Sequence, residues 1–115
     1  MPSPPLVPDD GPIDLMHLRR MTLGDAALER EVLTMFAAQA SRLAAALAAM
    51  PADAPALAHT LKGSARAIGA FAVADAAAEL ETLIRTNSDP AEALSELDEA
   101  VTQARMAIDA ILQDD

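Results

Sequence analysis

The sequence of 115 residues contains no cysteine, tryptophan or tyrosine, and only two phenylalanines. The absence of cysteine excludes disulfides, thiolate metal sites and cysteine nucleophiles. Aromatic and β-branched residues, which favour strands, are scarce, whereas alanine, the best helix former, is abundant. The composition therefore predicts an all-helical protein, and a chain of this length forms one domain around a single core.

Long apolar runs and basic clusters are also missing. No apolar stretch approaches the ~20 residues of a membrane-spanning helix, and the N-terminus lacks the features of a signal peptide. The formal net charge of −10 argues against nucleic acid or an anionic membrane as a partner. No Gly-rich nucleotide loop or Walker motif is present. We therefore expect a cytoplasmic protein without autonomous kinase activity.

Proline separates a tail from the remainder of the chain. Residues 1–12 hold five of the eight prolines and are predicted to form a flexible tail, which leaves residues 13–115 as the domain. Helical periodicity and capping signals predict a short helix over 13–21 and longer helices over about 26–50, 54–68, 72–85 and from 90 onward. Four long helices joined by short loops predict an antiparallel up-and-down four-helix bundle with a short extra N-terminal helix.

The capping signals are specific. Asp25 and Asp53 are predicted N-caps of the second and third helices, and Gly69 is the predicted end of the third. The apolar residues of the second helix are expected to face the core, and so are the methionines. That predicted stripe consists of Leu28, Val32, Met35, Phe36, Leu43, Leu47 and Met50.

One predicted helix carries a histidine on its polar side. At about 100° per residue, His59, Lys62, Gly63 and Arg66 fall opposite the apolar stripe of residues 54–70. His59 is therefore expected to face solvent from the middle of a rigid helix. The other histidine, His17, lacks such neighbours and is predicted to be ordinary surface or core filling.

A glycine at this place has a cost and a use. Gly in a helix interior costs roughly 1 kcal/mol relative to Ala, but at i+4 from His59 it leaves a gap through which a partner could approach the ring. Lys62, the only lysine in the chain, and Arg66 supply positive charge suited to a phosphoryl group. An exposed neutral imidazole can act as a nucleophile and form a covalent intermediate.

The run HTLKGS over residues 59–64, followed by Ile68-Gly69-Ala70 and by Leu80-Glu81, resembles the signature of histidine-containing phosphotransfer (HPt) domains. These domains are the intermediates of bacterial and fungal phosphorelays. The resemblance covers about residues 13–115 and includes the helix order and Phe36.

The resemblance implies a role for each motif residue. His59 would accept a phosphoryl group from the aspartyl phosphate of a response-regulator receiver domain and pass it to another receiver. Lys62 would hold the phosphoryl oxygens, while Gly63 and Arg66 would serve docking. The Mg²⁺ of the reaction belongs to the receiver, so no cofactor or metal of the chain's own is expected. A hybrid histidine kinase is a further candidate partner, and a monomer is expected.

Family members also often carry a polar residue near the histidine on the neighbouring helix. Residues 72–78 offer only Asp75 for this position, so the sequence does not place it. The orientation of the second ring nitrogen of His59 is left open with it.

Three other functions compete with a phosphorelay carrier. A helical module could dock a receiver or kinase without chemistry, in which case His59→Gln would keep its effect. The chain could be the detached substrate domain of a histidine kinase, although its end at Asp115 without a catalytic domain favours a free-standing carrier. A helical protein that opens on lipid should carry Lys/Arg-rich polar faces, and here these faces are acidic.

Overall fold

The computed structural model describes residues 11–113, so residues 1–10 of the predicted tail and the last two residues of the domain lie outside the described part. All regular structure in that part is helical. The five helices are α1 (Leu15–Met21), α2 (Ala26–Ala48), α3 (Ala54–Ile68), α4 (Phe71–Arg85) and α5 (Ala91–Gln113). The predicted all-helical class is confirmed, and each helix lies within a few residues of its predicted position. None of these helices is both long and apolar enough to cross a bilayer.

Helix ends follow the local chemistry of the sequence. The Asp25 carboxylate accepts the backbone N–H of Leu28 at 3.0 Å and caps α2, as predicted. Asp53 occupies the N-cap of α3, as predicted, and its side chain makes no capping hydrogen bond. The proline of the first turn of α3 supports the start of the helix instead, because its fixed φ is already helical.

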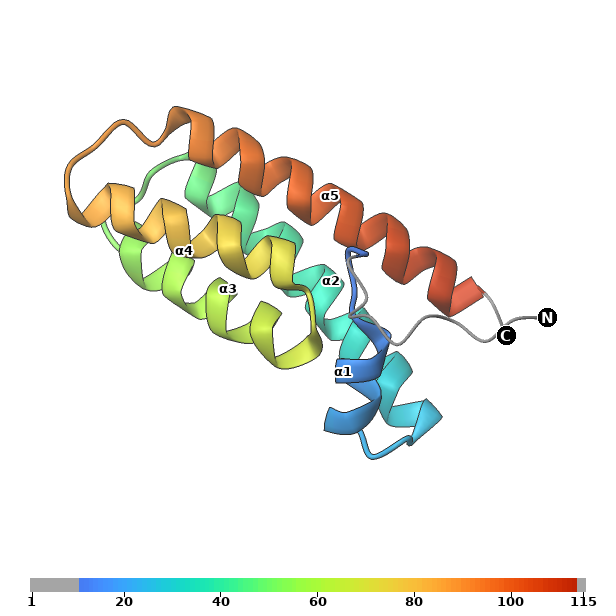
Figure 1. Ribbon diagram of the computed structural model, residues 1–115. Coiled ribbons are helices and arrows are strands. Elements are labelled where there is room, and N and C mark those ends of the chain that lie inside the picture. The colour runs from blue at the N-terminus through green and yellow to red at the C-terminus, as the bar shows by residue number, and fades with distance from the viewer. Residues whose placement is uncertain (1–10, 114–115) are drawn as a thin grey trace.

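The four longer helices lie lengthwise beside one another, and α1 is set across one end (Figure 1). α3 packs against α2 and α4, and α5 closes the ring by contacting α2 and α4. The shared core is aliphatic, and its largest fully buried side chains are Leu18, Leu33, Leu47, Leu61, Leu80, Leu97, Ile108 and Val73. Several alanines are buried among them, which lets the helix axes approach closely.

The predicted core stripe of α2 was partly wrong. Leu33 is fully buried, whereas Leu28 and Met35 are 41% and 64% exposed. The inward face consists of Leu33, Phe36, Ala40, Leu43 and Leu47. Ala40 is missing from the predicted stripe because that stripe contains only large apolar side chains. The methionines within residues 11–113 are exposed as well, contrary to prediction: Met16, Met21, Met35, Met50 and Met106.

The turn between α3 and α4 requires glycine. Gly69 has φ +88, the left-handed conformation that ends α3 as predicted. A Cβ at this position would lie 2.8 Å from the carbonyl oxygen of Asp14, because the Asp14 N–H donates to the Gly69 carbonyl at 2.9 Å. This close approach of two backbone segments joins the start of α1 to the end of α3.

His17 reinforces the same junction. Its Nε2 lies 3.1 Å from the carbonyl oxygen of Ala67, and since a carbonyl only accepts, Nε2 carries the proton. Its ring also meets the ring of Phe71 edge-on at 5.2 Å. His17 therefore joins α1 to α3 and α4.

Candidate functional site

His59 stands outward from the middle of α3. Its side chain is 66% exposed, while Leu61 and Ala65 on the opposite side of the helix are fully buried. The predicted orientation of the imidazole is confirmed. A helix in contact with α1, α2 and α4 therefore presents this ring to solvent.

A carboxylate from α4 fixes one nitrogen of the ring. Nδ1 of His59 lies 3.2 Å from Oε2 of Glu81. The pKa of Glu81 is lowered to about 2, so the carboxylate is ionised at neutral pH and can only accept. Nδ1 then carries the proton of the neutral ring, and the lone pair is on Nε2. The ring nitrogen that can act as a nucleophile is the one that Glu81 does not contact.

Glu81 is the centre of a set of charged side chains, here called the Glu81 network (His59, Lys62, Glu81 and Arg85). Lys62 donates to Oε1 at 2.8 Å, and Arg85 donates to Oε2 from Nε at 3.2 Å and from Nη2 at 3.0 Å. The hydrogen bond from Lys62 is the main cause of the lowered pKa of Glu81; burial opposes it, and Arg85 adds to it.

Burial differs among the members of this network. The side chain of Glu81 is only 9% exposed and that of Lys62 20%, whereas Arg85 is 59% exposed. A carboxylate so far removed from water requires its partners, because an unpaired buried charge is costly. The network therefore combines a held carboxylate with an exposed imidazole above it.

The other motif residues, Lys62, Gly63 and Arg66, differ in the contacts that they make. Lys62 is directed toward α4 and is paired with Glu81, rather than standing unoccupied beside the gap. A Cβ added to Gly63 would meet nothing within 4 Å, so the surface there is open, as the sequence suggests. Arg66 is exposed and forms no ion pair with the network. The structure thus brings His59 and Lys62 together through Glu81 and leaves Arg66 outside.

Sequence reasoning missed Glu81 as the polar neighbour of the histidine. The polar neighbour was expected within residues 72–78, which end about one helical turn before Glu81. Because α3 and α4 form a hairpin about Gly69-Ala70, residues at similar distances from that turn lie opposite each other. His59 precedes Gly69 by 10 residues and Glu81 follows Ala70 by 11. Counting from the turn, together with the i,i+4 pair of Glu81 and Arg85, could have identified it.

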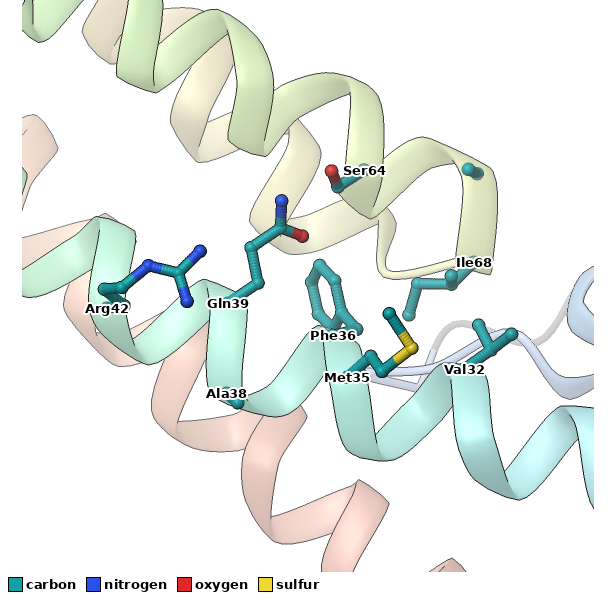
Figure 2. Close-up of a pocket in the computed structure, with 9 residues that line it drawn as sticks. Val32, Met35, Phe36, Ala38, Gln39, Arg42, Ser64 and Ile68 are labelled. Carbon is teal, nitrogen blue, oxygen red and sulfur yellow. The ribbon is translucent and has the colours of Figure 1, made fainter.

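A groove lies on the other side of α3, between it and α2 (Figure 2). Its volume is about 530 Å³, and its lining is mostly apolar: Val32, Met35, Phe36, Ala38, Gln39, Arg42, Ser64, Ala67 and Ile68. Figure 2 shows the Phe36 ring between the two helices, with Gln39 and Arg42 toward one end. Ser64 faces this groove. Among residues 11–113, no three His, Cys, Asp or Glu side chains gather as metal ligands would.

Comparisons with known proteins agree on one family. The Hpt domain family profile matches residues 30–113. The fold is also similar to the X-ray structure of a rice protein assigned as a histidine-containing phosphotransfer protein, with a TM-score of 0.78. That match has 21% identity and covers 90% of this chain and 81% of the rice chain. No curated protein matches the sequence. With the family profile covering most of the chain, the protein belongs to the Hpt domain family.

Proposed function

We propose that the protein is a phosphoryl carrier in a phosphorelay and that Nε2 of His59 is the acceptor atom. In the forward step the Nε2 lone pair forms the N–P bond. The O–P bond of a receiver's aspartyl phosphate breaks, and its electron pair remains on the departing aspartate carboxylate. The reverse of this step passes the phosphoryl group to another receiver. The Mg²⁺ used in the reaction would be held by the receiver.

Glu81 has two roles in the proposed reaction. Its hydrogen bond to Nδ1 holds the ring in the tautomer whose Nε2 carries the lone pair. When Nε2 becomes bonded to phosphorus, the ring acquires positive charge, and the ionised carboxylate 3.2 Å from Nδ1 stabilises that charge. Lys62, on the same carboxylate, is near enough in the helix to turn its ammonium toward the phosphoryl oxygens.

The surface around His59 supports a folded domain as the partner. Gly63 removes the side chain that would stand beside the ring, and nothing lies within 4 Å of the missing Cβ. Where α3 meets α2, the apolar groove would seat a helix of a receiver. Arg42, which lines the groove, and the exposed Arg66 would be available to acidic side chains. We interpret the ring of four helices as an antiparallel up-and-down bundle that holds these features rigid.

The observation that carries the proposal is an outward imidazole whose Nδ1 is held by an ionised carboxylate. The test is to incubate the protein with a receiver that carries a labelled aspartyl phosphate. Label that is labile in acid and stable in alkali should appear on the wild-type protein and on His17→Gln, because His17 faces Ala67 and Phe71. His59→Gln should remain unlabelled. Labelled His59→Gln protein would contradict the proposal.

A further inference from the structure

Arg85 is the member of the Glu81 network that has no part in the mechanism described above. Its two donors both reach Oε2 of Glu81, at 3.2 Å and 3.0 Å. The same oxygen accepts Nδ1–H of His59, whereas Lys62 donates to Oε1. Arg85 therefore shares one oxygen with the imidazole and leaves the other to the lysine.

Phosphorylation changes the charge beside this network. A phosphoryl group brings up to two negative charges at neutral pH and would attract Lys62, which lies one turn from His59 on the same helix. If Lys62 left Glu81 without a replacement, a carboxylate that is only 9% exposed would lose the cation on Oε1. Arg85 remains on Oε2 by two donors and keeps that carboxylate compensated. With a neutral His59, the charges of Lys62, Glu81 and Arg85 sum to one net positive charge. Without Arg85 they would sum to zero.

We propose that Arg85 is a positioning residue for phosphoryl transfer: it retains Glu81, so that Lys62 can exchange this carboxylate for the phosphoryl oxygens on His59. The inference rests on the proposed function and adds a residue to it. Arg85 is 59% exposed and lies in the last turn of α4, so its replacement leaves the core intact. Its effect on transfer can therefore be separated from an effect on folding.

The test uses phosphoramidate as the donor, which removes the receiver from the experiment. The Nε2 lone pair of His59 forms the N–P bond, and the P–N bond of phosphoramidate breaks. The protonated donor nitrogen leaves as ammonia with the bonding electron pair. Nδ1 retains its proton, which stays directed at Glu81. The rate of phosphohistidine formation is followed by ³¹P NMR on full-length protein.

A second readout follows Lys62 itself. Because Lys62 is the only lysine in the chain, one ¹H–¹⁵N side-chain ammonium signal reports on its partner. In the wild type this signal should shift on phosphorylation, and in Arg85→Ala it should shift much less. Phosphorylation of Arg85→Ala should be slower by about 5- to 10-fold, as expected for one charge-assisted contact. Arg85→Lys should recover most of the rate. Arg105→Ala, which removes an exposed arginine of α5, should match the wild type.

A double variant shows whether Arg85 acts through Glu81. In a Glu81→Gln background, Arg85→Ala should have no further effect on the rate. An equal loss in both backgrounds would overturn the inference, and so would wild-type rate and a wild-type Lys62 shift in Arg85→Ala. Either result leaves the proposed function standing, because His59 is still phosphorylated in the wild type. A wild-type protein that no donor phosphorylates would overturn both.

Discussion

Glu81 should make the stability of the protein depend on pH in a way that a single substitution isolates. Its pKa falls from 4.5 to about 2 in the folded protein. A lowered pKa in the folded state stabilises the protein above the unfolded pKa, and this contribution is lost as the pH falls toward the folded value. The relevant interval therefore runs from about pH 5 down to about pH 2.

The size of the effect follows from the shift. A difference of 2.5 between the two pKa values corresponds to at most about 3.4 kcal/mol at pH 7, from 1.36 kcal/mol per unit. Because Arg85 and His59 are well exposed, screening by water reduces this to about 1–3 kcal/mol. Near pH 3 less than half of it should remain.

The assay is urea unfolding of the wild type and of Glu81→Gln between pH 7 and pH 2. Groups outside the Glu81 network titrate alike in both proteins, so the difference in unfolding free energy reports on Glu81 and its contacts. Glu81→Gln should be less stable at pH 7, and the two proteins should converge as the pH falls toward 2. A difference that stays constant over this interval, or the absence of one at pH 7, would refute the reasoning.

Four further predictions concern the two glycines and the groove. Gly63→Ala should stabilise the protein by about 0.5–1 kcal/mol in urea unfolding, because the added Cβ meets open space. Gly63→Glu should fold normally but block phosphoryl transfer from a receiver. Transfer at the wild-type rate by folded Gly63→Glu would show that the gap has no part in docking. Gly69→Ala should cost more than about 1 kcal/mol of unfolding free energy, owing to φ +88 and the 2.8 Å approach to Asp14; unchanged stability would contradict this. Met35→Asp, at a position 64% exposed, should weaken receiver binding measured by calorimetry while changing stability by at most about 0.5 kcal/mol, and unaltered affinity would exclude the groove as the receiver's seat.

Periodicity and capping chemistry predicted the helices well because both depend on residues close in sequence. Gly69 is an example: the end of a predicted helix and a residue tolerant of positive φ coincide at one position. The outward direction of His59 was predictable for the same reason, since it follows from the apolar residues on the other side of its own helix. These features require no knowledge of neighbouring helices.

The features that could not be predicted from the sequence depend on contacts between helices. Met35 and Ala40 are both spaced from other apolar residues of α2 as residues on one helix face would be. Only the packing of α2 on α3 and α5 determines that the small alanine is buried and the methionine exposed. Glu81 was overlooked because its contact with His59 spans a hairpin. The pairing of Lys62 with that carboxylate follows from the same contact, and a helical wheel shows only that Lys62 and His59 share a side.

The central claim is that the phosphoryl group is carried on Nε2 of His59 while Glu81 holds Nδ1. The most direct measurement is a long-range ¹H–¹⁵N spectrum of the phosphorylated protein, labelled with ¹⁵N in its histidine rings, in which coupling to ³¹P identifies the modified nitrogen. Coupling to Nε2 of His59 alone is expected, with an unchanged spectrum for His17. Coupling to Nδ1 of His59, or to either nitrogen of His17, would contradict it.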